Sequence, residues 1–436
     1  MNPDRSLATG QRSLAPEPTT YQLEPALTAG CPETSTDQIQ YPVEVDYAYD
    51  DLDPALFEPP LEAGLGRWQP LLPPLAPETG LGEGHTPLVE VPSVGEWLGF
   101  EERTLSIKDE SQNPTWSHKD RLNRCTVSAA VREGAAGVVA SSTGNHGAAA
   151  AAYAACAGLP CVIVTAPETP PEVQAFIRSY GAILLAVDDL EVRQEAINRL
   201  ADEHGFHAVS SRTPIHTGHA WGPEGYKTIT YELYCQLGEV PGTVAVPTCY
   251  AELLYGVWKG FRELESLGVA KRTPTLVACE PGVRAPLCDA LESGETVARV
   301  DPEPTEAYSI KATTSSVRGL RAVTESDGVA VGFTEAHLEE SQHRLARSGL
   351  WQESSGAAGV AGLLALFEEG EGPSGVTADG ARVGGPDLLE RLDGPIVAIA
   401  TSSGFKDGEG YEAPRVEPTW DGIREALAAH PSIELA

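Results

Sequence analysis

The sequence predicts an α/β protein made of two domains, each with three layers and a mostly parallel sheet. Short segments rich in Val, Ile and Ala alternate with helical segments: GVVAS precedes NHGAAAAAYAACAG, and TVAVP precedes ELLYGVWKGFRELESLG. Repeated strand–helix units of this kind form parallel sheets whose faces are covered by helices. With 436 residues the chain is also too long for one compact core.

The first 85 residues lack this alternation. Residues 1–40 are rich in Pro, Thr, Ser and Gly and show no periodicity, so we expect a flexible tail there. Residues 41–85 are expected to form an N-terminal extension, because YPVEVDYAYD alternates like a short strand and Pro and Gly crowd the segment that follows it.

The composition excludes several classes of protein. Asp and Glu number 63 against 30 Lys and Arg, which gives a net charge of −33. Nucleic acids and acidic membranes need clustered cations, so neither is an expected partner. Lys supplies only 7 of the 30 basic residues, and this acidic, Lys-poor balance suggests a halophilic source. No signal peptide or membrane span is recognisable, which makes the cytoplasm the expected location.

Cysteine usage argues against a metal or disulfide framework. The 8 cysteines form no CxxC pair, so we expect no zinc ribbon and no bound metal. The HxxH spacings at His204/His207 and His216/His219 have no nearby Glu and no clear helical context. Loop or surface histidines explain them better than a metal site does.

Four loops at predicted strand ends are candidates for the chemistry, since ligands of parallel sheets bind there. The first reads NPTWSHKDR, in which Ser117 and Asp120 have nearly the spacing of a capping box. Lys119 would then lie in the first turn of a helix, where the dipole favours the neutral amine that Schiff-base chemistry needs. A lysine at a helix start is otherwise most often a solvated surface residue.

The second loop, SSTGNHG, lies between a strand and an Ala-rich helix. Its glycines allow close approach of a ligand, and the helix amides suit a carboxylate or a phosphate. An ordinary turn capped by Asn145 is the alternative. The third loop, VPTCYAELLYG, again joins a strand to a helix, and the fourth, IATSSGFKDG, places Thr401 at a strand end or in a simple turn.

Taken together, these loops resemble those of fold-type II pyridoxal-phosphate enzymes, and among them the threonine synthases. The resemblance runs from about residue 41 to residue 410 and keeps the order of the motifs. It rests on GLGEGHTPL (80–88), NPTWSHKDR (113–121), STGN (142–145) and TSSGFKD (401–407).

The resemblance implies a fold and a role for each loop. A larger cofactor-binding domain would span residues 86–124 and 216–415, and a smaller mobile domain residues 125–215, with pyridoxal 5'-phosphate in the cleft between them. A homodimer is implied by the family alone. Within the cleft, Lys119 would hold the cofactor, Asn145 would contact its phenolic oxygen and Thr401 its pyridine nitrogen. Two further groups complete the implied site: substrate contacts from Ser142, Thr143, Gly144, Asn145 and Lys311, and cofactor-phosphate contacts from Thr248, Cys249, Tyr250 and Ala251.

Three departures from the family pattern concern the edges of the site. The phosphate loop, typically GNAGN, reads TCYAE here, and we expect Glu252 to point away from the phosphate. Trp116 and His118 replace a Gly and a Phe beside Lys119 and crowd the mouth of the site. Lys311, in SIKATTSS, either meets a substrate phosphate or is a surface residue.

The implied activity is conversion of O-phosphohomoserine and water to threonine and phosphate, a lyase reaction on an amino-acid substrate. A serine or threonine dehydratase is the first alternative, because His146 after the Asn is commoner there. A β-replacement enzyme similar to cysteine or cysteate synthases is the second. A non-catalytic sensor of the cofactor or of an amino acid is the third, supported only by the altered phosphate loop.

Overall fold

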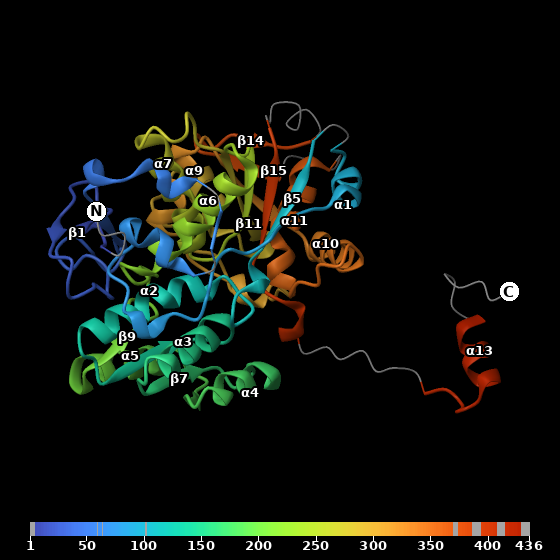
Figure 1. Ribbon diagram of the computed structural model, residues 1–436, viewed down its shortest axis with the longest axis horizontal. Helices are drawn as coiled ribbons and strands as arrows, with labels where there is room; N and C mark the ends of the chain where they lie inside the picture. Colours follow the sequence, from blue (N-terminus) through green and yellow to red (C-terminus); the bar gives the residue numbers. More distant parts are fainter. Residues whose placement is uncertain are drawn as a thin grey trace.

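The computed structural model describes residues 5–58, 60–62, 64–100, 103–368, 374–385, 394–407 and 415–428. Its largest element is an eight-stranded sheet in the order β14-β13-β12-β11-β10-β15-β5-β4 (Figure 1). The five central strands are parallel and the edge strands β4, β13 and β14 are antiparallel. The strands are β4 (Leu88–Glu90), β5 (Leu105–Asp109), β10 (Thr243–Pro247), β11 (Thr275–Pro281), β12 (Val329–Phe333), β13 (Gly375–Thr377), β14 (Arg382–Val383) and β15 (Ile396–Ala400).

A second sheet has four parallel strands in the order β8-β7-β6-β9. Its strands are β6 (Gly137–Ser141), β7 (Cys161–Thr165), β8 (Ile183–Ala186) and β9 (Phe206–Ala208). The helices α3 (Asn145–Cys156) and α4 (Pro171–Ser179) pack on one face, and α5 (Leu190–His204) packs on the other. The predicted class, α/β with two three-layer units and mostly parallel sheets, is therefore confirmed.

Helices also cover both faces of the larger sheet. One face carries α1 (Pro92–Trp97), α10 (Glu335–Arg347) and α11 (Ser354–Phe367). The other carries α2 (Lys119–Arg132), α6 (Gly222–Leu237), α7 (Glu252–Ser266), α8 (Pro286–Ser293) and α9 (Val317–Glu325). Helix α2 packs against both α6 and α3 and so joins the two units. Short 3₁₀ helices lie at Tyr49–Asp51, Pro54–Phe57, Leu65–Leu71, Pro77–Thr79, Glu110–Gln112, Gly282–Arg284, Tyr308–Ile310 and Gly404–Lys406.

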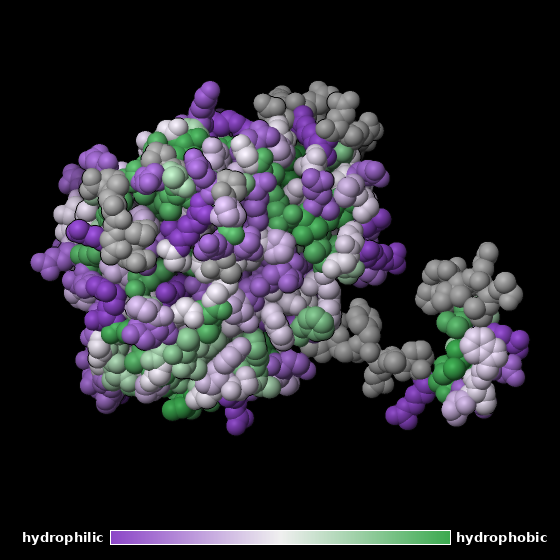
Figure 2. Space-filling model, in the orientation of Figure 1, coloured by the Kyte–Doolittle hydropathy of each residue, from purple (hydrophilic) through white to green (hydrophobic). Residues whose placement is uncertain are grey.

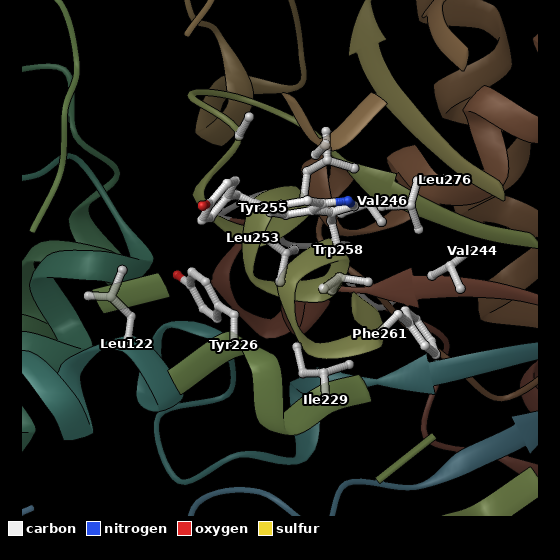
Figure 3. Packing of buried hydrophobic residues seen from close by; sticks show 14 of the residues in the cluster. Leu122, Tyr226, Ile229, Val244, Val246, Leu253, Tyr255, Trp258, Phe261 and Leu276 are labelled. Carbon is white, nitrogen blue, oxygen red and sulfur yellow. The ribbon is translucent and has the colours of Figure 1, made fainter. Parts of the chain in front are cut away.

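Strand β10 is buried on both faces of the larger sheet. Successive side chains of a strand point to opposite faces. Accordingly, Val244 and Val246 pack with α6 and α7, whereas Ala245 packs with α11. Figure 3 shows the first of these two cores, in which Trp258 and Phe261 of α7 lie against Val244 and Val246.

The prediction of a flexible tail over residues 1–40 is wrong for the part that the structure describes. Strands β1 (Ala8–Ser13), β2 (Thr20–Tyr21) and β3 (Val43–Tyr47) form an antiparallel sheet in the order β2-β1-β3. Buried residues of this segment, Leu14, Ala26 and Cys31 among them, belong to the same core as α6 and α7. Sequence periodicity did not predict that this segment is ordered. Only a few of its side chains are buried, and they pack against residues that are far away in the chain.

A further helix, α13 (Trp420–Ala428), lies apart from the body in Figure 1. Hydrophilic residues are spread over the face of the body drawn in Figure 2, with smaller apolar areas between them. Among the described residues, no helix is both long enough and apolar enough to cross a bilayer.

Candidate active site

A cavity of about 850 Å³ lies where the carboxyl ends of strands from both sheets meet. Most of the predicted site residues line it together, although they come from four separate loops of the sequence. They are Lys119, Ser142, Thr143, Gly144, Asn145, Cys249, Tyr250, Ala251 and Thr401. Two predicted residues, Thr248 and Lys311, are not among the residues that line it.

Lys119 is the first residue of α2, as predicted. Its Nζ donates a hydrogen bond of 3.0 Å to the hydroxyl of Tyr226. Burial lowers the pKa of the Lys119 ammonium below its usual range, and nearby Glu252 offsets this only in part. The amine is therefore biased toward its neutral form, which is the nucleophilic and proton-accepting form.

The expected capping box is absent from the start of α2. His118 is the N-cap residue and its side chain makes no capping hydrogen bond. The Asp120 carboxylate instead accepts hydrogen bonds from the backbone amide and hydroxyl of Thr115. These two hydrogen bonds between Thr115 and Asp120 hold the loop that precedes the helix.

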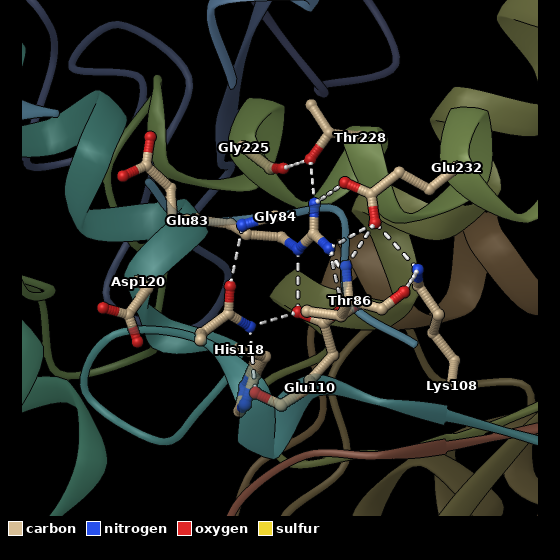
Figure 4. Close-up of polar contacts among 12 residues, drawn as sticks. Glu83, Gly84, Thr86, Lys108, Glu110, His118, Asp120, Gly225, Thr228 and Glu232 are labelled. Carbon is tan, nitrogen blue, oxygen red and sulfur yellow. Dashed lines mark hydrogen bonds and ion pairs between the residues drawn. The ribbon is translucent and has the colours of Figure 1, made fainter. Parts of the chain in front are cut away.

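A buried ion network ties α2 to neighbouring parts of the chain (Figure 4). Arg121 makes bidentate contacts to Glu110 and to Glu232, with distances of 2.6–2.8 Å. Lys108 adds a 2.8 Å contact to Glu232. Paired in this way, the buried charges orient the helix start that carries Lys119.

The second helix start at the cavity belongs to α3. Gly144 is its N-cap residue, and Ser142 Oγ accepts hydrogen bonds from the amides of Gly144 at 3.2 Å and Gly147 at 2.8 Å. A side chain at Gly147 would approach Ile163 and Ser142 to 3.2 Å, so the turn is tight. With no acidic residue in its first turn, this helix start suits an anionic ligand group such as a carboxylate.

Both ends of the Asn145 side chain have partners within the chain. Its Nδ2 donates to Glu353 at 2.8 Å, and its Oδ1 accepts from Ser402 at 3.0 Å and from Lys406 at 2.6 Å. Asn145 lines the cavity and is the first residue of α3, so it does not act as the N-cap that the alternative interpretation required. Its contact to a cofactor oxygen stays a prediction.

Sequence reasoning missed Glu353 and Lys406 as site residues. Burial raises the pKa of Glu353 to about 7 and lowers the pKa of Lys406 to about 8. Two groups that titrate close to neutral pH thus meet at Asn145, and Glu353 lines the cavity. The only signal in the sequence was their position, Glu353 just before a helix and Lys406 in the fourth loop.

Two histidines also line the cavity beside Lys119. Burial, reinforced by the charge of Lys119, lowers the pKa of His146 to about 4. The pKa of His118 lies well below its usual range for the same two reasons, and its Nδ1 lies 3.1 Å from the Thr401 carbonyl oxygen. Both imidazoles are therefore neutral at pH 7.

Trp116, expected to crowd the mouth, bridges the two units. Its ring stacks on Phe176 of α4 with centroids 5.3 Å apart and planes inclined by 14°. The residue has a φ of 61°, a left-handed conformation that costs a non-glycine residue roughly 1–2 kcal/mol.

Thr248 and Lys311 do not reach the cavity. The Thr248 hydroxyl donates to the Val246 carbonyl at 2.8 Å, and the residue is buried. Lys311 is exposed, and its carbonyl accepts a hydrogen bond from Arg284. The structure therefore favours the surface interpretation of Lys311.

Glu252 differs most from expectation. It was expected to point away from the site, but it lines the cavity as the first residue of α7. Its carboxylate lies 3.1 Å from His216 Nε2 and 4.0 Å from Arg318 Nη1. Burial alone would raise the pKa of Glu252, but His216, and after it Arg318, hold the pKa below its usual range.

Comparison with known proteins agrees with this geometry. The family model described as "Pyridoxal-phosphate dependent enzyme" matches residues 80–378. A threonine synthase of Methanocaldococcus jannaschii is 30% identical over 390 residues, which are 86% of this chain and 89% of the relative. A threonine synthase of Methanosarcina acetivorans is 29% identical over 83% of this chain and 86% of its own length.

Solved structures with the same fold include maize serine racemase, with a TM-score of 0.60 and 19% identity. That match covers 79% of this chain and 94% of the racemase. A fungal L-serine ammonia-lyase from Rhizomucor miehei matches with a TM-score of 0.59 and 20% identity, covering 73% of this chain and 94% of the lyase.

Proposed function

Because the chain belongs to the family of pyridoxal-phosphate dependent enzymes, we propose that it is a lyase that converts O-phosphohomoserine and water to threonine and phosphate. The observation that carries the proposal is the position of Lys119. A half-buried amine with a lowered pKa lies in one cavity with the start of α3, in a chain that resembles threonine synthases over most of its length.

The residues of the cavity fit the cofactor at its reactive end. Lys119 Nζ would hold it by a Schiff base, and Thr401 would face the pyridine ring. The buried Ser309 Oγ and His146 Nε2, which both line the cavity, make no hydrogen bond of good geometry within the described residues, as expected of a cavity shaped for a polar ligand. When bound, pyridoxal phosphate withdraws electrons from the attached amino acid and makes its α-hydrogen acidic.

The chain's own groups then bind the substrate and move protons. The start of α3, from Ser142 to Asn145, would hold the substrate carboxylate through backbone amides. Lys119 Nζ, biased toward its neutral form, would accept the α-proton. Glu353, with a pKa of about 7, can hold or release a proton at Asn145 near the working pH.

The experiment supplies O-phosphohomoserine to the purified protein with pyridoxal phosphate and follows phosphate and threonine together. Equal amounts of both products support the proposal. A 2-oxo acid formed from threonine or serine would instead identify a dehydratase, and a substituted alanine formed with added sulfide or sulfite would identify a β-replacement enzyme. If none of these products forms although cofactor is bound, the proposed lyase activity is overturned.

The setting of the enzyme is also part of the proposal. We propose a homodimer in the cytoplasm of a halophilic cell, in which the domain of residues 125–215 moves on substrate binding. The charge of −33 supports the halophilic part, because such self-repulsion needs salt to screen it. Melting curves in low and in molar KCl test it, and equal melting temperatures would contradict it. Light scattering tests the dimer.

A further inference from the structure

Helix α7 begins with a negatively charged side chain of the protein itself, that of Glu252. Helix starts attract anions because their amides point outward and the helix dipole adds positive potential. By the family resemblance, the loop before α7, residues 248–252, is where the cofactor phosphate would bind. The structure places Glu252, a carboxylate that lines the same cavity, in the first turn of this helix.

The Glu252 carboxylate is held in a shaped niche. His216 Nε2 lies 3.1 Å from it, and the His216 ring stacks on Tyr250 with centroids 4.2 Å apart and planes inclined by 7°. Gly218 forms the floor, since a Cβ there would lie 2.0 Å from Glu252 Oε1. The absence of a side chain at Gly218 therefore makes room for this carboxylate.

The niche also contains Arg318, a buried cation with one N–H group that makes no hydrogen bond within the described residues. The Arg318 side chain is 1% exposed, and its Nη1 lies 4.0 Å from Glu252. Nη1 and Nη2 donate to the carbonyls of Thr217 and Val43, whereas Nε has no partner within the described residues. Arg318 thus supplies positive charge, and His216 a ring nitrogen, beside this helix start.

A phosphate ester bound at this loop and the Glu252 carboxylate would both be drawn to the positive end of α7 and to Arg318. Two anions side by side in a cavity repel each other. We infer that Glu252 is an internal competitor for the cofactor phosphate, so that the phosphorylated cofactor binds only when this carboxylate is displaced.

The inference rests on the family's cofactor and not on the amino-acid substrate of the proposed function. Its test is a binding measurement on apoprotein without substrate, so a failure to make threonine leaves it intact. Equilibrium dialysis in molar KCl would compare pyridoxal phosphate with pyridoxal, which lacks the phosphate. The proteins are the wild type, Glu252→Gln and, as a matched control, Glu195→Gln.

Glu195 lines the same cavity from α5 and its side chain is 66% exposed, so its change removes an equal charge away from α7. We expect Glu252→Gln to bind pyridoxal phosphate at least about tenfold more tightly than the wild type, since 1.4 kcal/mol corresponds to tenfold. Pyridoxal should bind both proteins equally, and Glu195→Gln should change neither affinity by more than about twofold.

Two outcomes would overturn the inference. In the first, Glu252→Gln binds pyridoxal phosphate no more tightly than the wild type while it still binds pyridoxal, which shows that the variant is folded. In the second, the variant gains equal affinity for both compounds, so that the gain does not depend on the phosphate.

Discussion

The starts of helices α3 and α7 face the same cavity, and the chain treats them in opposite ways. Helix α3 begins behind Gly144 with no acidic residue in its first turn, and Ser142 arranges its amides. Helix α7 begins with Glu252, whose carboxylate is held by His216 and lies close to Arg318. The comparison shows that a helix dipole by itself does not make an open anion site, because a neighbouring side chain of the chain can satisfy it.

The largest effect is expected at Lys119, the first residue of α2. Replacing Lys119 with Ala removes the only group proposed both to hold the cofactor and to accept the α-proton. We expect turnover of O-phosphohomoserine to fall by more than about a thousandfold, as for other residues that act directly in the chemical step. Phosphate release measures it, and circular dichroism checks the fold. Activity within about tenfold of the wild type would refute the assigned role.

The next largest effect concerns the niche of α7. Gly218 has a φ of 64°, and a Cβ there would meet Glu252 Oε1 at 2.0 Å. Gly218→Ala therefore combines the left-handed penalty of roughly 1–2 kcal/mol with a clash. We expect a loss of stability larger than that penalty, measured by urea unfolding of the apoprotein.

The double variant Gly218→Ala/Glu252→Gly separates the two causes. With the carboxylate gone, Gly218→Ala should cost the conformational penalty and a tight contact with Arg318 Nη1 at 3.1 Å but no longer the clash with Glu252, so the two changes should be strongly non-additive. Additive effects would mean that Glu252 does not occupy the niche above Gly218.

A smaller effect is expected at the start of α3. Ser142→Ala removes the oxygen that accepts from the Gly144 and Gly147 amides, a loss typically worth about 1 kcal/mol at a helix start. We expect KM for the amino-acid substrate to rise several-fold while kcat changes less. Steady-state kinetics measure both constants. An unchanged KM would show that this helix start does not bind the substrate.

The smallest effect is a change in pH dependence near the α3 start. The pKa of Glu353 is about 7 in the folded protein, against 4.5 for an ordinary Glu, so folding favours its protonated form. Its stabilising contribution is complete below pH 4.5 and is lost as the pH rises through about 7. Glu353→Gln should therefore lose less stability than the wild type between pH 4.5 and 7.

Melting temperatures of the apoproteins across this range test the prediction, with Glu195→Gln as the control. Burial lowers the pKa of Lys406 to about 8. The change in stability that comes from Lys406 therefore occurs above pH 7, outside the pH range that is compared. Parallel melting profiles for the wild type and Glu353→Gln would contradict the raised pKa of Glu353.

The sequence by itself determined that the two main sheets are mostly parallel, and which loops bring Lys119 and residues 142–145 to the site. The alternation of buried strands with helices is local in the chain, so it predicted both sheets. Lys119 and residues 142–145 lie in loops that follow strands and begin helices, and this order along the chain was enough to predict that they share one edge of the fold. Their motifs carried the family resemblance for the same reason, since it depends on residue types and spacing alone.

Only the tertiary structure decided the rest, because it depends on contacts between residues far apart in the chain. Residues 8–21 are ordered by pairing with β3 and by packing near α6, which no local periodicity reveals. Glu353 and Lys406 acquired shifted pKa values only through burial beside Asn145. The side chain of Glu252 turned toward the cavity because His216, Gly218 and Arg318 together provide charge and space for it there.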